Sequence, residues 1–91
     1  MWETLDPDGR RVVLTLAAWQ HIVERHEELG GFRATILAAV ADPDEHIPGR
    51  AQDEEWFYRH GLGPSLWVKV AVHFGVTEGR IVTAFPRRRF P

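Results

Sequence analysis

The spacing of hydrophobic residues changes along the chain from a helical period to a strand-like one. Between residues 16 and 41, hydrophobic residues recur every three or four positions, which is the period of one face of an α-helix. From Leu66 to Phe74, every second residue is hydrophobic, as in a strand that buries one face. The pattern predicts an α+β fold in which the helices precede the main strands.

The N-terminal segment WETLDPDGRRVVL predicts a short β-hairpin, because Pro7-Asp8-Gly9 is typical of a turn between two strands. Thr15 is a suitable N-cap for a helix over residues 16–29, which Gly30-Gly31 would end. The hydrophobic face of this helix would carry Leu16, Trp19, Val23 and His26.

A second helix is expected over residues 32–41, where Asp42-Pro43 would end it. A short extended piece around His46–Ile47 comes next. Strands are expected after it over residues 54–60, 65–74 and 80–85, with Pro86 closing the last one before the basic tail RRRFP.

This order predicts two N-terminal helices, after a short β-hairpin, packed on one face of a roughly four-stranded antiparallel sheet. On the covered face we expect Val68, Val70 and Val72 to be buried against Trp19 and Val23. The other face would be open and would carry the alternate residues of the strands.

Composition limits the chain to a single domain, residues 1–91, with one modest core. The 91 residues are 44% hydrophobic and include four tryptophans. The absence of cysteine excludes disulfides and thiol nucleophiles. No hydrophobic run reaches the length of a membrane span, and the N-terminus has no signal-peptide core, so we expect a cytoplasmic protein.

The net charge of −2 hides an uneven distribution. Residues 1–58 hold five Lys/Arg against twelve Asp/Glu, whereas residues 59–91 hold six Lys/Arg against one Asp/Glu. All but one of these basic residues are arginine, which suits bidentate contact with phosphate.

The stretch HIVERHEE, residues 21–28, has the composition of a zinc-binding helix but not its spacing. Such a helix needs two histidines four positions apart, so that both point the same way. His21 and His26 are five apart, and their side chains would diverge by about 140° around the helix axis. We therefore expect no metal and no other cofactor.

The segments DGRRVVLT, HIVERH, ILAAVADPDEHI, EEWFYRH, LWVKVAV and GRIVTAFP together resemble the phage-associated barnase/colicin/RelE-like (BECR-fold) nuclease domains. The chain is also distantly similar to the BrnT toxins. The resemblance implies a helical N-terminal half on a four-stranded antiparallel sheet, and metal-independent RNA cleavage, often in toxins. The family has Arg-His-Pro-Glu after its first helix, whereas this chain has Arg25-His26-Glu27-Glu28, so the helix is expected to continue through Glu27.

RNA cleavage through the 2′-hydroxyl needs a base, an acid and cations that stabilise the phosphorane. His26 is the first candidate for acid–base catalysis, because imidazole titrates near neutral pH and a helix C-terminus favours its protonated form. The alternative is a structural histidine that hydrogen-bonds a backbone carbonyl of the sheet.

Lys69 and Thr83 would share the open face if Val72 pairs with Val82, whereas a slip of one residue would bury Thr83. Lys69 would then stabilise a pentavalent phosphate and Thr83 would hydrogen-bond its oxygens. The alternative is an ordinary polar face on which Lys69 covers Trp67.

Tyr58, Arg59 and His60 follow one another on a strand, so Arg59 would face opposite to the other two. Tyr58 is a candidate proton donor or base-stacking platform, or else a core aromatic residue. His60 is a candidate second acid–base group.

RNA phosphates are the expected partners of Arg59, Arg87, Arg88 and Arg89. Phe90 beside the last three would stack on a base. A solvated tail is the alternative. The acidic residues in 42–46 and 53–55 are expected to lie in solvated loops.

Two functions follow from these residues. The first is a small metal-independent endoribonuclease, acting as a toxin, with RNA as its substrate and an antitoxin or other inhibitor protein as its partner. The second is a non-catalytic module of the same fold that binds RNA or a protein, because a fold does not fix a function. Ser65 is the only serine, and GPSLW is no nucleophile elbow, which argues against other hydrolases.

Overall fold

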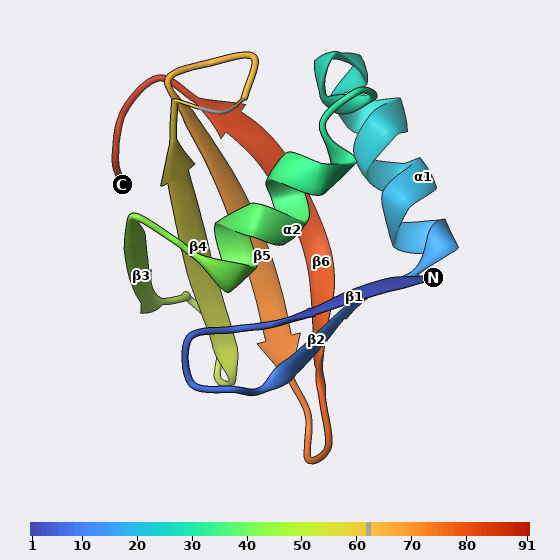
Figure 1. Cartoon of the computed structure of the whole chain (residues 1–91), viewed down its shortest axis with the longest axis vertical. Coiled ribbons are helices and arrows are strands. Elements are labelled where there is room, and N and C mark those ends of the chain that lie inside the picture. The colour runs from blue at the N-terminus through green and yellow to red at the C-terminus, as the bar shows by residue number, and fades with distance from the viewer. Residues whose placement is uncertain (62) are drawn as a thin grey trace.

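The structure is a computed structural model, and it describes residues 1–61 and 63–91. The elements in chain order are β1 (Trp2–Leu5), β2 (Arg11–Leu14), α1 (Leu16–Arg25), the 3₁₀ turn η1 (Glu27–Leu29), α2 (Arg33–Ala41), β3 (Glu45–Pro48), β4 (Glu54–His60), β5 (Trp67–Phe74) and β6 (Gly79–Arg87). Both α-helices lie on the same face of one sheet (Figure 1). The predicted α+β class is confirmed.

The sheet is larger than predicted and it is not purely antiparallel. Its six strands lie in the order β1-β2-β6-β5-β4-β3. The N-terminal hairpin joins the sheet, because β2 pairs in parallel with the start of β6, Val12 opposite Gly79 and Val13 opposite Arg80. The prediction of a four-stranded antiparallel sheet was wrong in this respect, since the local pattern of a hairpin does not reveal which strand edge it will join.

Helix α1 begins where its cap residue predicts and ends earlier than expected. The Oγ1 atom of Thr15 accepts a hydrogen bond of 3.1 Å from the backbone N–H of Ala18, which satisfies a free donor of the first turn. The helix ends at His26, whose φ of −139° leaves the helical region. The expected continuation through residues 27–29 is replaced by η1, which turns the chain so that Leu29 is fully buried.

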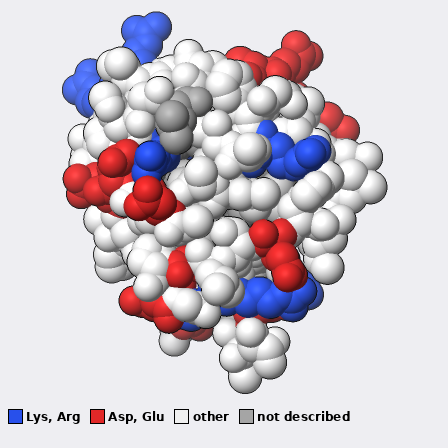
Figure 2. Space-filling view, viewed as in Figure 1, with Lys and Arg blue, Asp and Glu red and all other residues white. Residues whose placement is uncertain are grey.

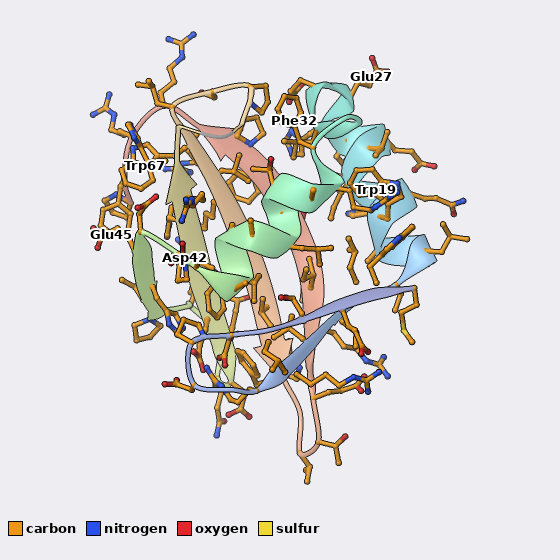
Figure 3. All side chains as sticks on the ribbon, viewed as in Figure 1. Trp19, Glu27, Phe32, Asp42, Glu45 and Trp67 are labelled. Carbon is orange, nitrogen blue, oxygen red and sulfur yellow. The ribbon has the colours of Figure 1, made fainter. Side chains whose placement is uncertain are left out.

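The hydrophobic core lies between the two helices and the covered face of the sheet. Val68, Val70 and Val72 are fully buried there, as predicted. Helix α2 lies against β1, β4 and β5, and α1 lies mainly against β6. Trp19 and Phe32 pack at the edge of the core, near the junction of the two helices (Figure 3). The main cover over β5 is therefore α2 rather than Trp19 and Val23 of α1.

A network of charged side chains joins the N-terminal hairpin to β4 and β3 across the sheet. Arg10 donates two hydrogen bonds of 2.8 Å to the two carboxylate oxygens of Glu55 and a third of 2.8 Å to Asp6. The Nε2 atom of His46 lies 2.6 Å from Glu55 Oε1. Hydrogen bonds from Arg10, and then His46, hold the pKa of Glu55 below its usual value. The expectation that the acidic residues of this region are merely solvated is wrong for Glu55.

Strand β6 ends at Arg87. This is one residue beyond Pro86, where the strand was expected to end. Proline has no N–H for a sheet partner and is therefore confined to edges. Since β2 pairs only with Gly79 and Arg80, the later part of β6 has a free outer edge among the described residues, where proline is tolerated.

Candidate active site on the open face of the sheet

The two sides of the molecule differ in how their charges are placed. On the helix-covered side, acidic and basic side chains are interspersed (Figure 2). On the opposite side, β4, β5 and β6 present cross-strand rows of side chains with no helix over them. The rows are Glu54–His73–Arg80, Trp56–Ala71–Thr83, Tyr58–Lys69–Phe85 and His60–Trp67–Arg87.

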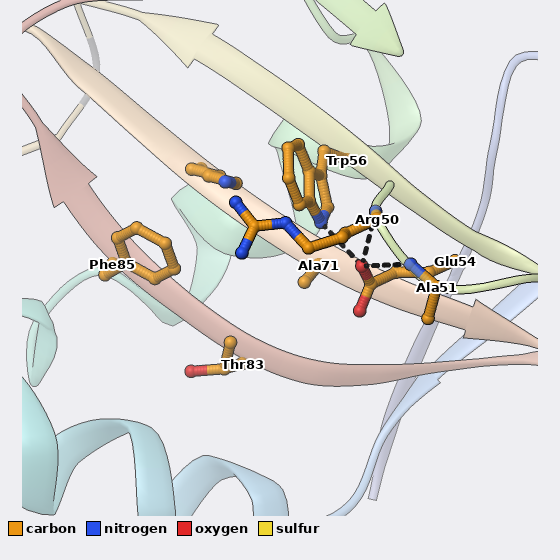
Figure 4. Close-up of a pocket in the computed structure, with 8 residues that line it drawn as sticks. Arg50, Ala51, Glu54, Trp56, Ala71, Thr83 and Phe85 are labelled. Carbon is orange, nitrogen blue, oxygen red and sulfur yellow. Dashed lines mark hydrogen bonds between the residues drawn. The ribbon is translucent and has the colours of Figure 1, made fainter. Parts of the chain in front are cut away.

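A pocket of about 510 Å³ opens above Ala71 in the second row. Alanine fills little of the space between its neighbours Trp56 and Thr83, so the rows on either side become walls. The lining residues are Arg50, Ala51, Glu54, Trp56, Lys69, Ala71, Thr83 and Phe85 (Figure 4). Lys69 and Thr83, which the sequence placed together on the open face, therefore do share one pocket.

A β-bulge decides that Thr83 faces this pocket. Ala71 pairs with Thr83 and Val72 pairs with Ile81, so Val82 is the extra residue of β6. The expected pairing of Val72 with Val82 was wrong. With the bulge in place, Thr83 lies beside Lys69, while Ile81 is buried in the core and Val82 is 48% exposed.

Lys69 lies in an enclosure of aromatic rings. Its Nζ atom is 3.4 Å from the ring centre of Trp56, 5.2 Å from that of Phe85 and 5.7 Å from that of Tyr58. The residue is only 7% exposed. Burial, and then the charge of Arg87, lower the pKa of Lys69 below its usual value. Lys69 covers Trp56 rather than Trp67, the ring expected in the structural alternative.

Glu54 supplies a carboxylate to the same pocket. Its Oε1 atom accepts hydrogen bonds of 3.0 Å from the backbone N–H of Arg50 and of 3.1 Å from the indole of Trp56 (Figure 4). The side chain lies across the loop between β3 and β4, and a Cβ atom on Gly49 would come within 2.6 Å of it. Glycine at position 49 therefore allows the loop to close around Glu54.

Arg50 reaches from this loop across the pocket toward Phe85 (Figure 4). No ion pair joins its guanidinium to a carboxylate among the described residues. Arg87 is on the same face, 5.9 Å from the ring centre of Phe85, and its NH2 atom donates a hydrogen bond of 2.8 Å to the carbonyl oxygen of Pro91. The pocket and its border thus hold three cations, the third being Lys69, against the single carboxylate of Glu54.

His26 lies just outside the pocket. Its ring stacks on Phe85 with the centroids 5.8 Å apart, and its Nδ1 atom is 3.5 Å from a carboxylate oxygen of Glu28. Phe85 is the residue that lies beside both His26 and Lys69, so the end of α1 approaches the pocket from the side of Phe85. Among the described residues, His26 has no carbonyl partner in the sheet, which the structural alternative expected. It does not line the pocket either.

Tyr58 and His60 do not line the pocket, although Tyr58 shares a cross-strand row with Lys69. Tyr58 is fully buried, its ring is 4.7 Å from Phe90, and burial raises the pKa of its phenol. His60 is exposed at the end of β4, with its ring 4.8 Å from Trp67. Tyr58 is therefore a buried aromatic residue on the open face, outside the core under the helices, and His60 lies in the next row, away from Lys69.

The candidate RNA-binding arginines divide into two groups. Arg59 lies on the helix-covered face, where its NH1 atom is 2.9 Å from an oxygen of Asp42. Arg88 and Arg89 are exposed beyond β6 on the chain that leads to Phe90. The tail is not simply solvated, since Phe90 also lies 5.7 Å from Trp67. The structure therefore brings Arg87 to the open face and leaves Arg59 outside it.

Sequence reasoning missed the other lining residues, which are Arg50, Glu54, Trp56 and Phe85 together with Ala51 and Ala71. Trp56 and Glu54 alternate with Tyr58 along the same strand, so the two-residue period of β4 could have placed them beside Lys69. No local signal could have found Arg50, because its place over the pocket depends on how the loop after β3 folds.

The described residues contain no group of three or more His, Cys, Asp or Glu side chains able to hold a metal ion. Within the same part of the chain, no helix is both long and hydrophobic enough to cross a membrane. Comparison of the chain with known proteins gave no match to a family model, to a curated protein or to a solved structure.

Proposed function

We propose that this protein is a small metal-independent endoribonuclease that cleaves RNA by transesterification through the 2′-hydroxyl. The proposed active site is the pocket above Ala71. The observation that supports it most is the convergence of an amine, a guanidinium, a hydroxyl and a carboxylate beside two aromatic rings on an uncovered sheet face. These groups come from Lys69, Arg50, Thr83 and Glu54, and the rings from Trp56 and Phe85.

The first requirement is a site for the phosphate that is attacked. The guanidinium of Arg50 has no carboxylate partner among the described residues, so it can pair with phosphate oxygens in the two-pronged manner typical of arginine. Thr83 would donate a hydrogen bond from its hydroxyl. Cations held in place before the reaction stabilise the charge of the phosphorane at little reorganisation cost.

The second requirement is proton transfer. Glu54 uses Oε1 for its hydrogen bonds, and its Oε2 atom receives none from the described residues, so Oε2 would accept the proton of the 2′-hydroxyl. Lys69 would protonate the leaving 5′-oxygen. Its lowered pKa makes it a better proton donor than an ordinary lysine, and such acid–base help is typically worth about 10²–10⁴ in rate.

The remaining candidates take supporting roles in this proposal. Arg87, Arg88 and Arg89 would guide the RNA backbone toward the pocket. His26 would hold Phe85, and His60 with Trp67 would contact a neighbouring nucleotide. We extend the proposal to a toxin that an inhibitor protein holds in check, so expression of the chain alone should arrest growth.

A non-catalytic RNA-binding module is the second candidate, and one observation favours it. The carboxylate of Glu54 already holds the loop between β3 and β4 through the backbone N–H groups of Arg50 and Ala51. A group with that structural task need not act as a base. The same cations and rings would then bind single-stranded RNA without cleaving it.

The test is incubation of purified protein with a single-stranded RNA oligonucleotide in EDTA, beside DNA of the same sequence. We expect RNA fragments that end in a 2′,3′-cyclic phosphate, and intact DNA, which lacks the 2′-hydroxyl. Lys69→Met and Glu54→Gln should each lower the cleavage rate by about 10²–10⁴. Arg88→Ala, outside the pocket, should mainly weaken binding and make it less dependent on salt.

RNA that binds to the wild-type protein but stays uncut in this assay would establish the binding module instead. RNA that neither binds nor is cut would refute both candidates.

A further inference from the structure

Lys69 differs from an ordinary surface lysine in having its amine almost enclosed and without an anionic partner. The residue is 7% exposed, and Nζ lies 3.4 Å from the ring centre of Trp56. None of the described residues forms a hydrogen bond or an ion pair with this amine. A buried amine without a carboxylate partner is the arrangement that turns lysine into a nucleophile.

The amine faces a cavity that has room for a small organic molecule. The pocket of about 510 Å³ lies within the range of small-molecule sites, about 300–1,000 Å³. Its walls combine the rings of Trp56 and Phe85 with the polar groups of Thr83 and Arg50. Mostly hydrophobic walls with a few converging polar groups are typical of such sites.

The charges around the cavity favour an anionic molecule, because Arg50 and Arg87 outnumber the carboxylate of Glu54. Arg50 reaches across the pocket (Figure 4) without a carboxylate partner among the described residues. Arg87 is close enough to Lys69 for its charge to act on the amine. An anionic group could therefore pair with Arg50 while the rest of the molecule meets Lys69.

We propose that this pocket binds a small aldehyde or ketone that carries a carboxylate or phosphate group, and that Lys69 forms an imine with its carbonyl carbon. This activity would be separate from RNA cleavage and does not depend on it. Arg50 would hold the anionic group, and the rings of Trp56 and Phe85 would enclose the carbonyl.

The reaction needs no oxidant or reductant. The lone pair of the neutral amine attacks the carbonyl carbon, a C–N bond forms, and the carbonyl π electrons pass to the oxygen, which takes up a proton. The nitrogen releases one proton to give the carbinolamine. Its hydroxyl takes up a proton and leaves as water when the nitrogen lone pair forms the C=N bond, and the nitrogen then gives up its remaining proton to solvent. Burial and the charge of Arg87 lower the pKa of the amine, which increases the neutral fraction that can attack.

The chain is well suited to a direct test, because Lys69 is its only lysine. The protein is incubated near neutral pH with glyoxylate and cyanoborohydride, which reduces an imine to a stable amine, and the adduct is located by peptide mass spectrometry. We expect an adduct on Lys69 beside the one on the α-amino group of Met1. The adduct on Lys69 should form faster in the folded protein than in the same chain unfolded in guanidinium chloride, since the lowered pKa increases the neutral fraction of its amine.

Two further comparisons test the pocket and the anion. Ala71→Leu, which fills the cavity, should abolish the preference for the folded chain. Arg50→Gln should slow the reaction with glyoxylate and with glycolaldehyde phosphate, which tests the phosphate group, more than the reaction with uncharged glycolaldehyde, which loses only the effect of Arg50 on the pKa of Lys69. Lys69→Arg should leave only the α-amino group of Met1 to react.

Equal labelling of Lys69 in the folded and unfolded chains, or an adduct on Met1 alone, would overturn the proposal. Equal rates for the charged and uncharged aldehydes in the wild-type protein would show that no anion subsite exists and would refute the assigned ligand class.

Discussion

At the scale of single residues, Lys69 combines a cost in stability with a place in the proposed chemistry. Removing a charged amine from water costs free energy unless an opposite charge compensates it. Here aromatic ring faces provide the compensation, chiefly that of Trp56, whose ring centre is 3.4 Å from Nζ. A ring face stabilises a cation less than a carboxylate does. A residue that destabilises its own fold is commonly kept for function.

We therefore expect Lys69→Met to stabilise the protein while it lowers the rate of RNA cleavage by about 10²–10⁴. Methionine fits a similar volume without the desolvation cost, so the free energy of unfolding should rise by about 0.5–2 kcal/mol. Urea titration followed by tryptophan fluorescence measures it. Arg88→Met, at an exposed position, should stay within about 0.5 kcal/mol of the wild type. A less stable Lys69→Met variant would mean that the amine has a stabilising partner.

His26 offers a second test at this scale, because its ring contacts Phe85 rather than lining the pocket. We expect His26→Ala to lower the free energy of unfolding by about 0.5–1.5 kcal/mol, the value of an aromatic pair. Cleavage by the folded fraction should fall less than the roughly 10²–10⁴ expected for a lost acid–base group. A full loss of rate with unchanged thermal stability would instead make His26 the acid or base.

At the scale of elements, the bulge in β6 adds one residue to the strand. The side chains just before and just after the bulge can therefore face opposite sides of the sheet. Ile81 is buried in the core, and Thr83 lies in the pocket. In a regular strand, residues two positions apart face the same side, so these two would conflict. Val82 takes up the difference and is itself half exposed.

Deletion of Val82 should therefore leave both pairings intact. Ile81 and Thr83 would become neighbours and still face opposite sides, so we expect a folded, cleaving protein that loses about 1 kcal/mol or less. Deletion of Val70 from the regular part of β5 is the control, because it reverses the facing of every following side chain and should prevent folding. Circular dichroism and the RNA assay compare the two, and equal damage by both deletions would contradict this account of the bulge.

At the scale of the whole molecule, the network of Arg10, Asp6, Glu55 and His46 joins the N-terminal hairpin to β3 and β4. It connects strands near the two opposite edges of the sheet, on the side of the sheet opposite the pocket. Since hydrogen bonds from Arg10 lower the pKa of Glu55 in the folded protein, the network makes stability depend on pH.

The sign follows from that lowered pKa. The contribution of Glu55 is fully present above its unfolded pKa, about 4.3, and is lost as the pH falls through its lower folded pKa. We expect Glu55→Gln to cost about 1–2 kcal/mol at pH 7, and urea titrations should show this difference shrinking below about pH 4. Exposed Glu24→Gln is the control. A difference that does not change with pH would show that the charge of Glu55 contributes nothing.

The sequence by itself determined which kinds of element form and in what order. The period of the hydrophobic residues predicted both helices and the strands after residue 53, and Thr15 marked the start of α1 correctly. These features depend on residues within a few positions of one another, because helix caps, turns and the facing of side chains are local. For the same reason, the sequence could partly predict that Lys69 and Thr83 share one face of the sheet.

Only the tertiary structure decided how distant segments meet. The parallel contact of β2 with β6, the bulge at Val82 and the reach of Arg50 over Lys69 each join segments far apart in the chain. These pairings depend on how the whole core packs and on which charged groups still need a partner. No short stretch of the sequence determines either. For that reason the sequence indicated Lys69 as a candidate, and only the fold surrounded it with Glu54, Arg50 and Trp56 to form a pocket.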